Sequence, residues 1–287
     1  MKRKIEIIKA SGESSIFSEE KLRNSLRHSG AKEEQVEIIV NDIYNRLYEG
    51  ISTKEIYSQA FKMLKGTARH TAAKYQLKKA IMDLGPSGFP FEKFVAEIFR
   101  HLGYSVSVGE FVDGQCVKHE IDVIASTNKL QLMIECKYHN LQGIICNVKI
   151  PLYIHSRFKD VEATWLKEPK NGGKVYQGCV VTNTRFSDDA LKYGNCAGLK
   201  LIGWSYPQTG GLKDQIDELG LYPITCLTSI TKSEKQYLLD KNIVLCNEIN
   251  NNKKILENAG IRAKRLQIVI DEAYLLCQHK ASSNGGR

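Results

Sequence analysis

The sequence predicts an α/β protein, with a central mixed sheet flanked by helices between a mostly helical N-terminal segment and a helical C-terminal unit. Helical periodicity dominates residues 1–85 and 212–280, whereas short apolar strand patterns alternate with helices over residues 86–211. A Gly-Pro-Ser-Gly cluster at residues 85–88 marks the first boundary. We therefore expect three domains, over residues 1–85, 86–211 and 212–280.

The first domain is expected to contain one strand followed by four helices. Ser18 is expected to be the N-cap of the first helix, and Ser52 or Thr53 that of the third, because their hydroxyls can accept from backbone N–H groups. The predicted elements are a strand over residues 4–9, a helix from Ser18, a helix over 33–48, a helix from Ser52 or Thr53, and a helix over 68–84.

The two later domains are expected to differ in pattern, because strands and helices alternate in the central one and helices follow short turns in the last. In the central domain we expect helices over residues 91–102, 147–163 and 187–193, and strands over 104–109, 119–125, 131–137, 175–182 and 199–204. In the tail we expect helices over residues 213–219, 233–241, 247–258 and 262–276, with disorder over 281–287.

Composition narrows the class of protein. The formal net charge of +9 allows a polyanionic partner. No window is long and apolar enough to span a bilayer, and the charged N-terminus lacks the apolar core of a signal peptide. The eight cysteines form no Cys-x-x-Cys pair, which favours free thiols and a cytoplasmic location. Zinc binding by Cys136, His139 and Cys146 is an alternative, although a fourth ligand is not apparent.

Acidic residues lie at the ends of two predicted strands, and the second strand carries Glu-x-Lys. Side chains alternate along a strand, so Glu135 and Lys137 share a face while Cys136 points the other way. If the two strands pair, Asp122 lies beside them. Two carboxylates and an ammonium can hold a divalent cation and orient a water for phosphodiester hydrolysis. The alternative is that these charges simply face solvent.

Further motifs flank these strands on both sides. A helix with Phe91-Glu92 ends in Leu102-Gly103-Tyr104, while Thr182-Asn183 and then Phe186-Ser187 with Ala190 follow the Glu-x-Lys strand. With these motifs in order, residues 87–207 resemble the PD-(D/E)xK nuclease superfamily, in particular its Mrr-like restriction endonuclease branch. The resemblance implies a restriction-endonuclease-like fold for this domain.

The resemblance also implies a role for each matching residue. Asp122 and Glu135 would be the ligands of a Mg²⁺ ion, and Lys137 would orient the attacking water. Glu92, on the first helix, would be an auxiliary acid that completes the metal site, and Glu97 is the competing choice. The expected catalytic residues are therefore Glu92, Asp122, Glu135 and Lys137.

The neighbours of Asp122 depart from the Gly-rich turn that often precedes it in the family. Glu120 shares a face with Asp122 and could join the site, whereas His119 points the other way and is expected to be structural. The basic residues that follow the Glu-x-Lys strand either contact phosphates or face solvent. These residues are Lys149, Arg157 and Lys159.

The first domain carries a second resemblance. Residues 7–13, 17–22, 50–57 and 75–81 resemble matching parts of the ATP-cone, a regulatory nucleotide-binding module, over residues 3–84. The resemblance implies ATP or dATP as a regulatory ligand, with Ala10 standing where the family usually has Arg. The triphosphate would be bound by Lys9, Lys21 and the helix N-terminus at Thr53.

Two points about the nucleotide follow from the sequence. No Gly-x4-Gly-Lys-Ser/Thr phosphate loop is present, so hydrolysis of the nucleotide is not expected. The alternative to nucleotide binding is a domain that serves interaction only.

The tail over residues 227–244 faintly resembles a helix-hairpin-helix DNA-binding unit. Ser229-Ile230-Thr231 stands in place of the usual Gly-Ile-Gly hairpin. A helical cap on the nuclease domain is the alternative prediction.

Together these observations predict a Mg²⁺-dependent endonuclease that cuts double-stranded DNA. The ATP-cone resemblance implies regulation by ATP or dATP, and the nuclease resemblance alone implies a role in restriction of foreign DNA. A homo-oligomer is expected, since each chain carries one site and two strands must be cut. Two alternatives stay open: a nucleotide-responsive DNA-binding regulator with an inactive nuclease fold, and a structure-specific nuclease of repair or recombination.

Overall fold

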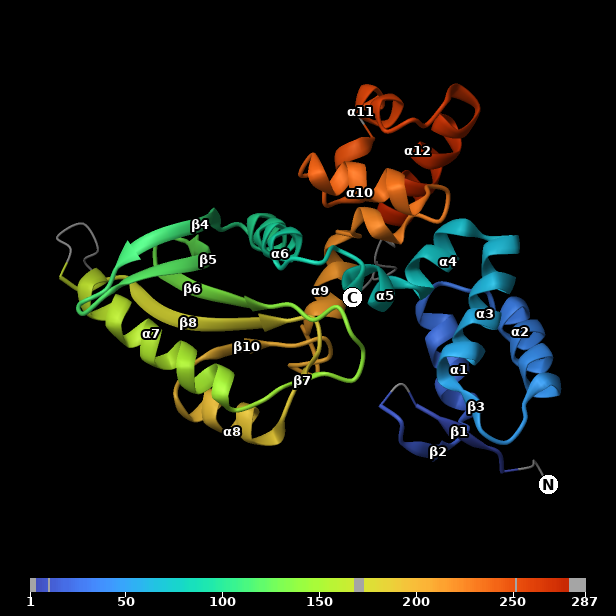
Figure 1. The fold of residues 1–287 in the computed structure, drawn as a ribbon, viewed down its shortest axis with the longest axis horizontal. Helices are drawn as coiled ribbons and strands as arrows, with labels where there is room; N and C mark the ends of the chain where they lie inside the picture. Colours follow the sequence, from blue (N-terminus) through green and yellow to red (C-terminus); the bar gives the residue numbers. More distant parts are fainter. Residues whose placement is uncertain (1–3, 10, 168–172, 251, 279–287) are drawn as a thin grey trace, which may run out of the picture. The chain divides into compact units, whose positions relative to one another are not determined.

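The computed structural model describes residues 4–9, 11–167, 173–250 and 252–278; the predictions for Ala10 and for residues 281–287 lie outside these ranges. The chain forms two compact units, shown in Figure 1. One unit joins Met1–Ile81 with Tyr222–Gln278, and the other contains Met82–Leu221. Residues 1–81 and 222–278, which are most of the expected first and third domains, therefore fall into a single unit, whereas residues 82–85 and 212–221 belong to the other.

The second unit is built on a mixed five-stranded sheet in the order β10-β8-β6-β5-β4. Strands β4, β5 and β6 pair antiparallel, whereas β6 with β8 and β8 with β10 pair parallel. This confirms the predicted central mixed sheet. The strands are β4 (Ser105–Asp113), β5 (Lys118–Ser126), β6 (Leu130–Lys137), β8 (Val175–Thr182) and β10 (Lys200–Ile202).

Helices cover both faces of this sheet. Figure 1 shows α6 on one side and α7 with α8 on the other. The Ser187 hydroxyl accepts from the Ala190 N–H and so begins α8 with a side-chain cap. The helices are α6 (Phe89–His101), α7 (Lys149–Trp165), α8 (Asp188–Cys196) and α9 (Leu212–Leu219), beside a small parallel pair of β7 (Ile145–Cys146) and β9 (Arg185–Phe186).

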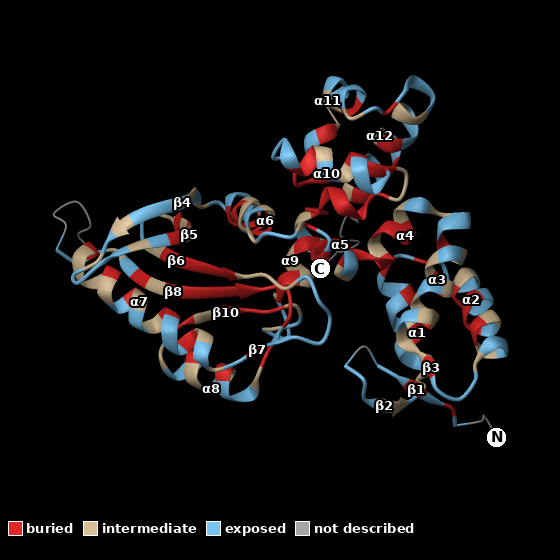
Figure 2. Cartoon of the chain, viewed as in Figure 1, coloured by how far each residue is buried: buried red, intermediate tan, exposed pale blue. Residues whose placement is uncertain are grey.

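The core lies under α7, where the central strands are buried on both faces (Figure 2). Phe158 of α7 packs with Ile121 and Met133 of the sheet. Gly178 of β8 lies beneath this helix, where an added Cβ would come within 2.7 Å of Leu199 Cδ2 and 3.1 Å of Phe158 Cγ. The missing side chain therefore allows α7 to lie close to the sheet.

We expect Gly178→Ala to destabilise the second unit by about 1–3 kcal/mol, because the new methyl group overpacks the core. Gly66→Ala is the matched control. Gly66 is helical and has no heavy atom within 4 Å of an added Cβ, so alanine there is expected to be neutral or stabilising. Urea unfolding of both variants checks the opposite signs; equal effects would contradict the close approach of α7.

The first unit starts with a three-stranded sheet in the order β2-β1-β3, packed against helices. The predicted fourth helix is divided in two at Gln76. The elements are β1 (Glu6–Ile8), β2 (Ser14–Ile16), α1 (Glu19–His28), α2 (Glu33–Arg46), β3 (Ile51–Ser52), α3 (Thr53–Thr67), α4 (Arg69–Tyr75) and α5 (Leu77–Met82).

The C-terminal helices complete the same unit. The Gln76 Nε2 donates to the Cys226 carbonyl at 2.6 Å, and the Thr225 hydroxyl donates to the Ala80 carbonyl at 2.6 Å. This grouping differs from the alternative prediction of a cap on the nuclease domain. The elements are η2 (Ile224–Cys226), α10 (Lys232–Asp240), η3 (Cys246–Ile249), α11 (Lys253–Asn258) and α12 (Ala263–Cys277).

Candidate active site

The register between β5 and β6 brings the two predicted metal ligands together. Val123 pairs with Ile134, so one further residue along the antiparallel pair places Asp122 beside Glu135. Asp122 Oδ2 accepts from the Cys136 N–H at 2.7 Å. This bond fixes the Asp122 carboxylate against the neighbouring strand.

Glu135 is buried and binds two cations. Its Oε1 pairs with Lys137 Nζ at 2.5 Å, and its Oε2 pairs with Arg157 Nη1 at 2.6 Å. Arg157 comes from α7 and also donates to the backbone carbonyl of Glu120. The sequence marks Arg157 only as a candidate phosphate contact, because its ion pair with Glu135 depends on how α7 packs against the sheet.

The backbone beyond Lys137 is held by the Thr-Asn motif at the end of β8. The buried Thr182 hydroxyl donates to the Lys137 carbonyl at 2.7 Å. The buried Asn183 donates through Nδ2 to the His139 carbonyl at 2.7 Å and accepts from the His139 N–H at 2.9 Å. These bonds explain physically why polar residues occupy the core at this point.

Glu92, from the first turn of α6, contributes a third carboxylate to the electrostatics of the site. Burial, followed by the charges of Asp122, Glu120 and Glu135, raises the pKa of Glu92 to about 7. Burial and the Glu135 charge raise the pKa of Asp122 to about 6, although the Cys136 N–H opposes this. The four predicted catalytic residues are therefore close enough to interact electrostatically. The carboxylates carry more negative charge than the nearby cations neutralise.

This donor set fits a hard divalent cation that binds oxygen. Within the described ranges, no group of three or more His, Cys, Asp or Glu side chains is arranged to hold a metal. Among these residues the structure therefore assembles no three-ligand site, either at Cys136, His139 and Cys146 or with Glu92 beside Asp122 and Glu135. Mg²⁺ needs only one or two carboxylates, because waters and substrate phosphates supply the rest. Asp122 and Glu135 meet that requirement, and Mg²⁺ binding stays a prediction.

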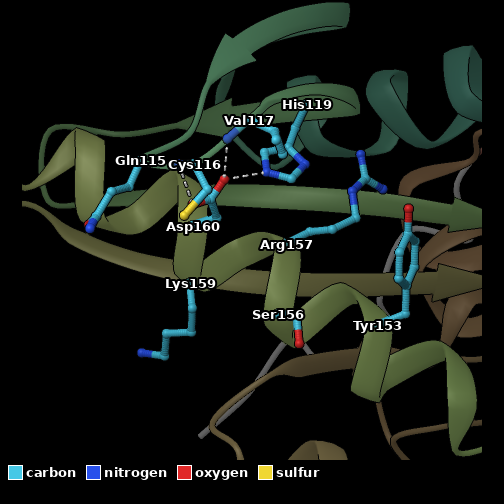
Figure 3. A pocket seen from close by; sticks show the side chains of 9 residues that line it. All are labelled: Gln115, Cys116, Val117, His119, Tyr153, Ser156, Arg157, Lys159 and Asp160. Carbon is cyan, nitrogen blue, oxygen red and sulfur yellow. Dashed lines mark hydrogen bonds and ion pairs between the residues drawn. The ribbon is translucent and has the colours of Figure 1, made fainter.

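Glu97 and His119, two further charged or titratable residues near the site, form contacts with other side chains. Glu97, the competing choice on α6, forms an ion pair with Arg100. His119 Nε2 lies 2.7 Å from Asp160 Oδ2, which agrees with its expected structural role. Asp160 also accepts from the Cys116 and Val117 N–H groups, so it closes the turn between β4 and β5 (Figure 3).

The residues predicted to bind nucleotide are partly brought together. Ile8 of β1 pairs in parallel with Ser52 of β3, so Lys9 and Thr53 follow adjacent strands at the same edge. Lys9 pairs with Glu13 at 3.2 Å. Thr53 begins α3, but Ser52 supplies the cap by accepting from the Glu55 N–H. Lys21 is exposed in the first turn of α1. Its grouping with Lys9 and Thr53 rests on the ATP-cone resemblance alone.

In the tail, the hairpin N–H groups at 228–229 are bonded to a carboxylate. Glu272 accepts from Thr228 N at 2.8 Å, Thr228 Oγ1 at 2.7 Å and Ser229 N at 2.9 Å. A carboxylate of the same chain therefore occupies the N–H groups at the start of the predicted hairpin. DNA binding by the tail stays a prediction.

Comparison with known proteins adds the family. Residues 85–204 match the restriction endonuclease family, and residues 222–277 match the family described as AF1548-like, C-terminal. An uncharacterized protein of Archaeoglobus fulgidus is 36% identical over 180 residues, which is 62% of this chain and 97% of that protein. The chain belongs to the AF1548-like family.

The structural comparison agrees with this assignment. The crystal structure of AF1548, a protein of unknown function, has a TM-score of 0.54 and 34% identity, and the match covers 67% of this chain and 98% of that one. The match over residues 85–204 confirms the restriction endonuclease resemblance predicted for residues 87–207. This domain of the AF1548-like protein indicates a nuclease. Residues 1–84 match no family model, so the ATP-cone stays a prediction. Within the described part of this AF1548-like chain, no helix is long and apolar enough to cross a membrane.

The raised pKa values of Asp122 and Glu92 make the stability of the metal-free protein depend on pH. Their ordinary values are 3.8 and 4.5, against about 6 and 7 in the folded protein. Over that window the folded state binds more protons, so the free energy of unfolding falls as pH rises. We expect Asp122→Asn to raise the Tm at about pH 8 and to change it little at about pH 4, below most of the window.

Thermal unfolding in EDTA at the two pH values checks this expectation. Glu97→Gln is the control on α6, because Glu97 forms an ion pair with Arg100. An equal gain in Tm at both pH values would show that ionisation of Asp122 is not the cause.

Proposed function

We propose that this protein is a Mg²⁺-dependent endonuclease that hydrolyses phosphodiester bonds of double-stranded DNA. The observation that carries the proposal is the juxtaposition of Asp122, Glu135 and Lys137 on neighbouring strands of a restriction endonuclease-like domain. The nearby Glu92 and the raised pKa of Asp122 support it, because a bound cation would offset that negative charge.

Each residue has a distinct task in the proposed reaction. Asp122 and Glu135 would hold the ion; Mg²⁺, when bound, polarises the phosphate and lowers the pKa of a water. The Lys137 ammonium orients that water and offsets charge on the phosphate. Although burial lowers the pKa of Lys137, its bond to Glu135 raises it on balance, so Lys137 stays protonated near neutral pH. Glu92, with a pKa of about 7, is suited to hold a water and exchange a proton with it.

We further propose that ATP or dATP binds the N-terminal segment at Lys9, Lys21 and Thr53 and shifts a conformational or oligomeric equilibrium of a homo-oligomer. The parallel register that places Lys9 beside the start of α3 supports a phosphate site there. Gating requires the nucleotide to bind one state better than another. Restriction of foreign DNA is the biological role that the nuclease family favours.

Lys137→Ala and Asp122→Ala are expected to lower the rate of plasmid nicking in Mg²⁺ by about 100-fold or more while largely sparing DNA binding. Lys129→Ala is the matched control, because Lys129 is an exposed lysine in the turn between β5 and β6. Nicking and fluorescence anisotropy with a duplex provide the two readouts. Cutting that survives in Lys137→Ala would reject this active site.

The role of Glu92 is tested separately against Glu97 on the same helix. Glu92→Gln is expected to slow nicking by about 10-fold or more, because it removes a proton-exchanging carboxylate from the site. Glu97→Gln should leave the rate unchanged, since Glu97 pairs with Arg100. The reverse ranking would make Glu97 the auxiliary acid.

Nucleotide regulation is tested with the double variant Lys9→Ala/Lys21→Ala. We expect it to weaken ATP or dATP binding by about 10-fold or more and to remove any nucleotide effect on nicking. Lys62→Ala, on the exposed face of α3, controls for the loss of a lysine. If saturating nucleotide changes neither the nicking rate nor the assembly size in ultracentrifugation, the gating hypothesis fails.

The two alternatives are distinguished by the same protein preparations. A DNA-binding regulator would bind duplex and nucleotide but cut no plasmid, methylated or not. A structure-specific nuclease would cut branched DNA in preference to linear DNA through Asp122 and Lys137. The intact set of Asp122, Glu135 and Lys137 favours an active enzyme over a regulator.

A further inference from the structure

Arg157 belongs both to the proposed active centre and to a surface pocket next to it. Its guanidinium pairs with Glu135, and its side chain lines an open pocket of about 490 Å³ between α7 and the β4–β5 turn. In Figure 3, Arg157 extends from α7 alongside Tyr153, whereas the Lys159 side chain points away from Arg157. The Arg157 Cζ lies 5.5 Å from the Tyr153 ring centroid. The Arg157 side chain is only 13% exposed and also donates to the Glu120 carbonyl, but it borders the open pocket and an aromatic ring.

Both oxygens of Glu135 are occupied by cations. Lys137 takes Oε1 and Arg157 takes Oε2, and the Glu135 side chain is only 8% exposed. A buried carboxylate without partners is strongly unfavourable, so these two contacts stabilise Glu135 in the metal-free protein. A divalent cation shared by Asp122 and Glu135 would need one of these oxygens and would be repelled by the group that holds it.

Arg157 is the cation that can leave. Lys137 lies on the same strand as Glu135, and its carbonyl is bonded to Thr182, so it stays beside Glu135. Arg157 reaches Glu135 from another element through a long side chain and lines the pocket next to it. A guanidinium binds phosphate oxygens in a bidentate manner, so a DNA backbone offers it an equivalent partner.

We propose that Arg157 is a positioning residue that holds Glu135 in the metal-free protein, competes with the divalent cation for it, and transfers to a DNA phosphate when metal and substrate bind. This inference rests on the proposed function. It makes metal binding and DNA binding mutually favourable, because the phosphate removes the competitor of the metal. The free protein then binds metal weakly until DNA is present.

Calorimetric titration of the full chain with Mn²⁺, without DNA, tests the competition directly. Arg157→Gln is expected to bind Mn²⁺ about 10-fold more tightly than the parent protein, because one Glu135 oxygen and one repelling charge are released. Lys192→Gln on α8 is the control, since Lys192 is an exposed lysine that does not line the pocket. A purely structural role for Arg157 predicts weaker Mn²⁺ binding, as Glu135 loses its alignment.

Cleavage gives the second readout. At saturating Mg²⁺ we expect Arg157→Gln to nick plasmid about 10-fold more slowly, because the phosphate contact is lost while metal binding improves. Arg157→Lys, which keeps the charge, should fall between the parent and Arg157→Gln in both assays. Mn²⁺ binding that is unchanged, weaker or absent in Arg157→Gln overturns the inference. Tighter Mn²⁺ binding with no plasmid cutting by the parent protein would keep the competition and reject the nuclease instead.

Discussion

The antiparallel register between β5 and β6 is the constraint on which the rest of the site depends. A slip by one residue would turn Asp122 to the opposite face and move it away from Glu135. The buried residues Val123 and Ile134 fix the pairing, and the Cys136 N–H adds a direct bond to the Asp122 carboxylate. The position of the acidic pair therefore follows from burying the apolar faces of these strands, so the core and the site are determined together.

Burial of Glu135 sets the second requirement, because a carboxylate in this position needs compensating charge. Lys137 on the same strand and Arg157 on α7 supply it, and the Thr182 and Asn183 side chains hold the backbone that presents Lys137. The cations that would act on a phosphate are thus also those that stabilise the buried Glu135 carboxylate in the metal-free protein. Substitutions in the site are therefore expected to change stability and activity together.

Much of this arrangement could be predicted from local pattern. The two-residue period of β6 puts Glu135 and Lys137 on one face, and strong apolar runs located β5, β6 and β8 to within about two residues. The contact of Arg157 with Glu135 could not be predicted, since it depends on the packing of α7 over Gly178. The short strands β2 and β3 carry too few residues to show a period. The nucleotide residues Lys9, Lys21 and Thr53 rest on family likeness, and their role stays a prediction.

The two-unit division has a consequence for synthesis of the chain. Residues 82–221 lie between the two parts of one compact unit, so the nuclease-like domain is an insertion with two covalent connections to its host. During translation this inserted domain can fold while its host still lacks the helices of Tyr222–Gln278. Until those helices are made, the donors and acceptors at Gln76 and Ala80 lack their native partners, and the apolar surface around them is exposed to aggregation. The host unit is therefore expected to fold after the inserted domain and to be the more prone of the two units to aggregate during synthesis.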